Sequence, residues 1–81
     1  MNDKTMTFSI INDEELEIRK IMLQVYEALK EKGYNPVNQI VGYILSEDPT
    51  YITTHKNARS LILRIDRDTL LQNLIKYYVA Q

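Results

Sequence analysis

The sequence contains no cysteine and only one histidine, His55. The missing cysteine excludes disulfide bonds and thiolate metal sites, and the single histidine excludes a histidine-rich metal site. The residues that remain offer few pairs of a nucleophile with a base, and a glycine-rich phosphate-binding loop is also lacking. A catalytic pocket would have to form around His55, which lies in a polar stretch where a lone histidine is usually inert. The sequence therefore predicts a non-enzymatic protein that needs no metal and no cofactor.

Long apolar runs and an excess of charge of one sign are missing as well. The 81 residues carry ten basic and eleven acidic side chains, and no apolar run approaches the length of a membrane span. The composition is that of a globular protein, and neither a disordered chain nor a nucleic-acid-binding protein is expected. The first residues, MNDKTMTFSIINDEE, lack the basic and apolar regions of a secretory signal. We expect a cytoplasmic protein without membrane insertion, and a domain this small often needs a second subunit for stability.

Glycine and proline are scarce, with two of each, and this scarcity favours helices joined by tight turns. Asn35-Pro36 and Asp48-Pro49 both place a capping side chain directly before a proline, which is typical of a helix N-terminus. They predict the start of a second helix and of a short third helix or turn. The other predicted boundaries are Asn12 or Asp13 to Lys32 for the first helix, Asn57 for the start of the fourth, and Asp66 or Asp68 for the start of the last.

Apolar side chains recur at helical spacing and predict an apolar stripe on each helix, which faces the core in the second and fourth helices. These residues are Ile18, Ile21, Met22, Val25 and Leu29 in the first helix, Ile40, Val41, Ile44 and Leu45 in the second, Ala58, Leu61, Ile62 and Ile65 in the fourth, and Leu70, Leu71, Leu74, Ile75, Tyr78 and Val79 in the last. The sequence thus predicts an all-α fold, a compact bundle of four to five short helices over residues 12–81. Residues 1–11 differ, because Met6, Phe8 and Ile10 alternate with polar residues. They predict a lone strand or an extended or mobile N-terminal tail.

Six tyrosines are many for a chain of this length. A small core cannot bury them all, and tyrosine combines a large contact area with a polar tip, which suits an interface. The alternative is that they lie half-buried around the core with their hydroxyl groups in water. The candidate interface residues are Tyr43, Tyr51, Tyr77 and Tyr78.

A local basic patch is formed in the sequence by Lys56, Arg59, Arg64 and Arg67. Together with the short helices of residues 35–65, it leaves open a small helix-turn-helix-like DNA-binding regulator as an alternative function. The acidic net charge argues against this alternative, since such arginines commonly pair with neighbouring carboxylates on the surface. The same three arginines are candidate docks for a phosphate group.

One long stretch, VYEALKEKGYNPVNQIVGYILSEDPTYITTHKNAR, strongly resembles the IreB regulatory phosphoprotein family of low-GC Gram-positive bacteria. The segment Asp3-Lys4-Thr5-Met6 with Phe8, and the pair Arg67-Asp68, also match the pattern of the family. The resemblance therefore covers nearly the whole chain. It implies a small, helical, cytoplasmic homodimer with no known catalytic activity.

The resemblance also implies how the protein is regulated. IreB-like proteins are substrates of a transmembrane Ser/Thr kinase with extracellular PASTA domains, and a matching phosphatase removes the phosphate. The best-studied member is a negative regulator of cephalosporin resistance, which is an output of cell-envelope stress. The modified residues are threonines of the N-terminal tail, so Thr5 is the predicted site and Thr7 a lesser candidate. Asn2 stands where a doubly modified relative has its first threonine, which favours a single modification here.

Overall fold

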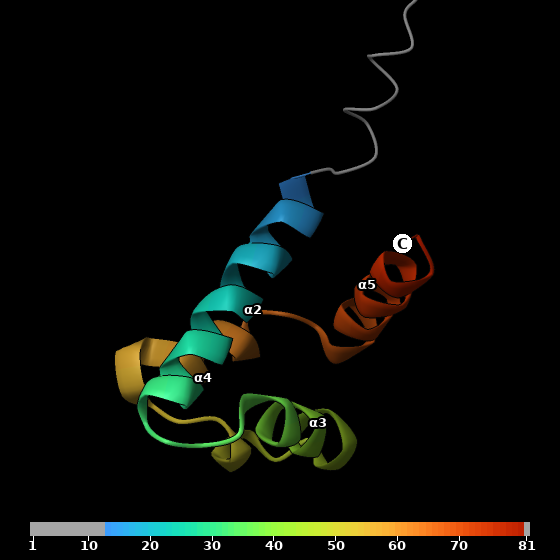
Figure 1. Cartoon of the computed structure of the whole chain (residues 1–81). Helices are drawn as coiled ribbons and strands as arrows, with labels where there is room; N and C mark the ends of the chain where they lie inside the picture. Colours follow the sequence, from blue (N-terminus) through green and yellow to red (C-terminus); the bar gives the residue numbers. More distant parts are fainter. Residues whose placement is uncertain (1–12, 81) are drawn as a thin grey trace, which may run out of the picture.

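The computed structural model describes residues 13–80. Within this range the chain forms four α-helices and no strand, which confirms the predicted all-α fold. The helices are α2 (Asp13–Glu31), α3 (Pro36–Ser46), α4 (Ala58–Leu63) and α5 (Arg67–Val79), with 3₁₀ turns at Pro49–Tyr51 and His55–Asn57 (Figure 1). The predicted tail of residues 1–11, including its possible strand, lies outside the described residues.

Both proline-led helix starts are confirmed. The side chain of Asn35 accepts a hydrogen bond from the backbone N–H of Asn38 at 3.1 Å, and Pro36 is the first residue of α3. Asp48 accepts in the same way from the N–H of Thr50 at 3.0 Å, at the start of the first 3₁₀ turn. Each cap satisfies an N–H group that has no partner within its own helix.

The starts of α4 and α5 differ from each other. Asp66 caps α5, since its carboxylate accepts from the N–H of Thr69 at 3.1 Å, so the last helix begins after Asp66 and not after Asp68. The predicted start of the fourth helix at Asn57 is confirmed, because Asn57 directly precedes α4, but its side chain makes no capping hydrogen bond. Lys56 and Asn57 both have positive φ, at 53° and 61°, and the chain turns sharply there before α4 begins.

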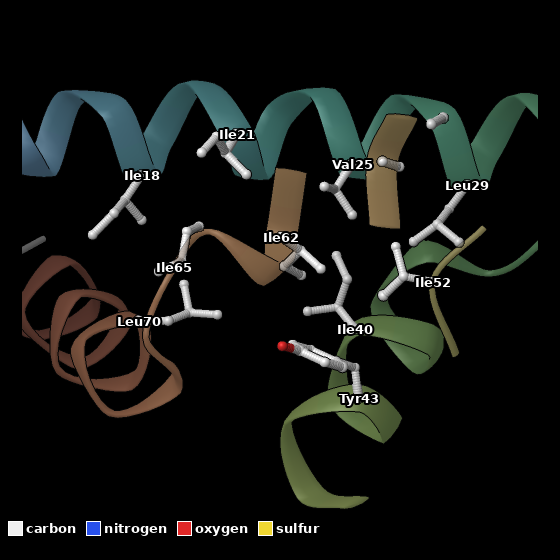
Figure 2. Packing of buried hydrophobic residues seen from close by; sticks show 12 residues of the cluster. Ile18, Ile21, Val25, Leu29, Ile40, Tyr43, Ile52, Ile62, Ile65 and Leu70 are labelled. Atoms are coloured by element: carbon white, nitrogen blue, oxygen red, sulfur yellow. The ribbon is translucent and has the colours of Figure 1, made fainter. Parts of the chain in front are cut away.

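The core lies on one side of α2, where α3 and α4 pack against it (Figure 1). Ile62 of α4 lies at its centre, between α2 and α3 (Figure 2). The stripe predicted for the first helix belongs to this core, and the inward face predicted for the fourth helix is confirmed, with Met22 and Leu61 only partly buried. The buried residues are Ile18, Ile21, Val25, Ala28, Leu29, Ile40, Tyr43, Ile52, Ala58, Ile62, Ile65 and Leu70.

The inward face of α3 differs from the prediction. Ile40 and Tyr43 point into the core, and Tyr43 is only 4% exposed, whereas Val41 and Leu45 lie on the solvent side. Apolar residues cover two adjacent faces of this helix, so their spacing alone does not show which face turns inward. The prediction that Val41 and Leu45 face the core is therefore wrong. Tyr43, predicted as an interface residue, is buried in the core of its own chain.

Candidate protein interface on helix α5

Helix α5 carries an apolar stripe that the rest of the described chain leaves exposed. We call Leu71, Leu74, Ile75, Tyr78 and Val79 the α5 stripe; neighbours three and four positions apart place them on one side of the helix. Only Leu70, on the adjacent side, is buried, and it anchors α5 next to Ile65 (Figure 2). Of the stripe predicted for the last helix, only Leu70 therefore belongs to the core.

A polar contact joins the C-terminal half of α5 to α2. Arg19 donates from Nη2 to the hydroxyl oxygen of Tyr77 at 3.4 Å, and its guanidinium carbon lies 5.3 Å from the centroid of the ring. This geometry is that of a cation–π contact. Tyr77 thus faces α2 of its own chain, whereas the adjacent Tyr78 is 81% exposed. Of the predicted interface tyrosines, Tyr78 is the one most available to a partner.

Tyr51 has a structural role in its own chain. Its ring lies against Gly42 of α3, where an added Cβ atom would come within 2.5 Å of Tyr51 Cε1. This close approach explains a glycine in the middle of a helix, where glycine otherwise lowers stability. Gln39 donates from Nε2 to the backbone oxygen of Tyr51 at 3.0 Å. The amide and tyrosine groups of this region therefore hold the loop after α3 in place.

Two of the three candidate phosphate docks bind backbone carbonyl groups. Arg59 donates from Nε to the oxygen of Ile52 at 2.8 Å. Arg67 donates from Nη1 to the oxygen of Ile44 at 2.7 Å, and its Nη2 pairs with the carboxylate of Glu47. These contacts occupy part of their donor capacity and reduce the positive charge available to a phosphate group. The helix-turn-helix alternative gains no support from them.

Arg64 has more free surface than Arg67, with its side chain 62% exposed and 3.5 Å from the carboxylate of Glu17. It lines a groove of about 300 Å³ between α2 and the start of α5. Carboxylates dominate the polar part of this groove, so a phosphate would find a single cation there. The lining residues are Glu14, Glu17, Ile18, Ile21, Arg64, Ile65, Asp66 and Thr69.

His55 is part of an ion-pair cluster at the end of α2. Its Nε2 lies 2.8 Å from Oε1 of Glu31, and Nζ of Lys56 lies 3.2 Å from the same carboxylate. The hydrogen bond with His55, followed by that from Lys56, holds the pKa of the Glu31 carboxyl below its ordinary value of 4.5. The cluster ties the turn before α4 to α2.

Replacing Glu31 with glutamine is expected to reduce the loss of stability in acid. A carboxyl whose pKa is lowered in the folded state contributes stability above its ordinary pKa, near 4.5, and loses it as the pH falls through the lower folded value. The difference in unfolding midpoint between the parent and Glu31→Gln should therefore be largest near neutral pH and shrink in acid. Urea titrations at several pH values test this, with Glu27→Gln on the same helix as the control. Parallel pH curves for parent and Glu31→Gln would contradict it.

Two structural features are absent from residues 13–80, a cluster of metal-ligating side chains and a membrane-spanning helix. No group of three or more histidine, cysteine, aspartate or glutamate side chains in this range could hold a metal ion. None of the helices over the same residues has both the length and the apolar character needed to cross a bilayer.

The family model of the IreB regulatory phosphoproteins matches residues 3–80. The chain belongs to the IreB family. A UPF0297 protein of Ruminiclostridium cellulolyticum is 56% identical over 77 residues, which cover 95% of this chain and 88% of the relative. A UPF0297 protein of Acetivibrio thermocellus is 52% identical over 80 residues, which cover 99% of this chain and 89% of the relative.

The candidate phosphorylation sites, Thr5 and Thr7, lie outside the described residues, although the family match includes both. The contact of Arg19 with Tyr77 was missed, because the two residues are 58 positions apart and no local pattern connects them. The uncovered face of α5 is predictable from the sequence as an apolar stripe, but its spacing does not show whether it turns toward the core or toward solvent.

Proposed function

We propose that this IreB-family protein is a non-enzymatic regulatory phosphoprotein that works in the cytoplasm as a homodimer. A transmembrane Ser/Thr kinase of the PASTA type phosphorylates its N-terminal segment, and a matching phosphatase reverses the modification. Its output is cell-envelope stress signalling, with negative regulation of cephalosporin resistance. The observation that carries the proposal is the match to a regulatory phosphoprotein family over residues 3–80.

The exposed surface of the described residues agrees with a protein that acts by binding. The α5 stripe offers apolar area to a partner, and Gln39, by contrast, uses its side-chain amide within the fold, where it donates to the backbone oxygen of Tyr51. A phosphate on Thr5 would add about −1.5 to −2 charges at neutral pH. It would do so eight residues before α2, whose first turn already carries Asp13, Glu14 and Glu15. Repulsion from these carboxylates would change where the modified segment lies, and among the three arginines Arg64 has the most free surface for it.

Replacing Thr5 with alanine is expected to abolish most phosphate incorporation by the kinase. The cytoplasmic kinase domain, ATP and the full chain suffice for the assay, with mass spectrometry to assign the modified residue. Thr7→Ala is the matched control, because it removes a threonine two positions away, and it should retain most of the incorporation. Phosphate should also be absent from the protein isolated from a strain that lacks the kinase. Unchanged incorporation in Thr5→Ala would overturn the assignment of the site.

A further inference from the structure

We infer that the N-terminal segment, residues 1–12, docks in the groove between α2 and the start of α5 of its own chain, with Phe8 and Ile10 against the isoleucines of the groove. Phosphate on Thr5 weakens this contact. The docking itself needs no modification, whereas its weakening rests on the proposed phosphorylation of Thr5. A single intramolecular contact thus couples the modified segment to the helical domain.

The first argument is the position of the groove beside the start of α2. Glu14 lines the groove, and α2 begins at Asp13, so the segment joins the helix next to it. Ile21, at the far end, lies about 10 Å from Glu14 along the helix axis. The chain from Asp13 back to Phe8 spans up to about 17 Å, which allows the segment to reverse its direction and reach the groove. So short a tether gives an effective concentration on the order of millimolar, an advantage that a separate partner lacks.

The second argument is that the groove and the segment match in chemistry and in spacing. Ile18, Ile21 and Ile65 form the apolar part of a groove of about 300 Å³ and lie together at one end of the core (Figure 2). In an extended chain Phe8 and Ile10 lie on one side, about 7 Å apart, which is close to the helix pitch of about 5.4 Å. The described part of the chain forms no strand that could pair with this alternating pattern. The groove is therefore the surface that can cover it.

The third argument is that the groove is acidic, whereas the part of the segment nearest to it is uncharged. Carboxylates of Glu14, Glu17 and Asp66 line the groove, and its single cation, Arg64, lies 3.5 Å from Glu17. Residues 5–12 contain no charged side chain, so the bare segment enters the groove without repulsion. An acidic partner would be repelled by the same carboxylates.

Phosphate on Thr5 changes this balance of charge. Thr5 is three residues from Phe8, about 10 Å along an extended chain, and the screening length at physiological salt is about 8 Å. The phosphate charge of about −1.5 to −2 is therefore only partly screened from the carboxylates of the groove. We expect phosphorylation to lower the equilibrium constant of docking by about twofold to threefold.

A spin label on the segment tests the docking, because the chain has no cysteine and one can be introduced at Ser9. Ile21 lines the groove, and Leu23, two residues later, lies on the opposite side of α2 at nearly the same height. With a nitroxide on Ser9→Cys, paramagnetic relaxation of the Ile21 methyl groups should exceed that of the Leu23 methyl groups by more than about fivefold, since opposite faces of a helix are about 10 Å apart. Equal relaxation at the two residues would overturn the inference.

Two variants of the labelled chain show which side chain holds the segment. Phe8→Ala should lower the ratio of the two relaxation rates by at least about threefold, because it removes the aromatic ring from the groove. Thr7→Ala is the matched control, since Thr7 lies next to Phe8 on the other side of the alternating pattern and its truncation should leave the ratio unchanged. Circular dichroism verifies that both variants keep their helices. A ratio that Phe8→Ala does not change would exclude Phe8 as the docked side chain and overturn the inference.

A mixed sample identifies the chain that supplies the segment. Spin-labelled chains without isotopes are combined with isotope-labelled chains without a spin label, so that only contacts between copies cause relaxation. Weak relaxation at both Ile21 and Leu23 supports docking within one chain. Strong relaxation at Ile21 alone would assign the groove to the segment of a second copy and contradict the inference.

Treatment with the kinase and ATP tests the effect of the phosphate. The phosphorylated chain should show a lower ratio than the bare chain, and Thr5→Ala treated in the same way should keep the ratio of the parent. Phosphate incorporation at Thr5 without a change in the ratio overturns the coupling. A chain that takes up no phosphate contradicts the proposed function instead, and the docking is then decided by the ratio in the bare chain, which is measured without the kinase.

Discussion

Replacing Ile62 with alanine is expected to lower the free energy of unfolding by about 2–5 kcal/mol. Ile62 is completely buried, and its side chain lies between α2 and α3 at the centre of the core (Figure 2). Truncation removes apolar contacts with both helices and leaves a cavity that helices held by short turns cannot easily close. A domain of this size has a total stability of roughly 4–12 kcal/mol at ordinary values per residue. The substitution would therefore remove a large share of it.

The matched control for Ile62→Ala is Leu63→Ala, which removes a similar side chain one position later in the same helix. Leu63 is exposed, so its truncation should change the free energy of unfolding by no more than about 0.5 kcal/mol. Urea titrations followed by circular dichroism measure both variants, at one fixed protein concentration because association adds to apparent stability. Equal effects of the two substitutions would mean that α4 does not pack through Ile62.

The parts of the fold that local chemistry determines could be predicted from the sequence. A cap and a following proline act within four residues, so Asn35-Pro36 and Asp48-Pro49 identified two element starts directly. The inward face of α2 was also predictable, because Ile18, Ile21 and Val25 recur along a single stripe of a long helix. In both cases the residues that decide the structure lie within a single element, and in α2 the apolar residues mark only one face of the helix.

The direction of α3 and α5 could not be predicted, because it depends on what surrounds them. Both helices carry apolar residues on two adjacent faces, and only the packed structure shows that Tyr43 turns inward while Leu45 does not. Thr5, in turn, was identified by the family resemblance, and no physical property of the isolated residue marks it.

The roles of Arg59, Arg64 and Arg67 could not be predicted from the sequence, because their contacts form only in the folded chain. Arg67 and Ile44 are 23 positions apart, so their hydrogen bond leaves no trace in the sequence. The local basic patch in the sequence suggested that these three arginines act together, for example as a phosphate dock. In the fold, Arg59 binds Ile52, Arg67 binds Ile44, and Arg64 lies near Glu17. Because their surroundings differ, we expect substitution of Arg67 to lower stability much more than substitution of Arg64.

Replacing Arg67 with alanine is expected to lower the free energy of unfolding by about 1.5–3 kcal/mol. Its guanidinium donates to the carbonyl oxygen of Ile44, in the last turn of α3, where helix carbonyl groups lack partners within the helix. It also pairs with Glu47, which ends α3 in a left-handed conformation at φ 64°. The Arg67 side chain is only 31% exposed, so water replaces these contacts poorly. Loss of the side chain should free the start of α5 from α3.

Arg64→Ala is the control for Arg67→Ala, since Arg64 is mostly exposed and its pair with Glu17 is long. Its removal should cost no more than about 1 kcal/mol. Urea titrations measure both, and a small, equal cost for the two variants would show that Arg67 does not join α3 to α5. The comparison also decides how a phosphate dock can be sought. If Arg67→Ala is strongly destabilised, a regulatory defect in that variant reports on the fold, and Arg64→Ala is the variant in which loss of a phosphate-dependent response can be attributed to a lost phosphate contact.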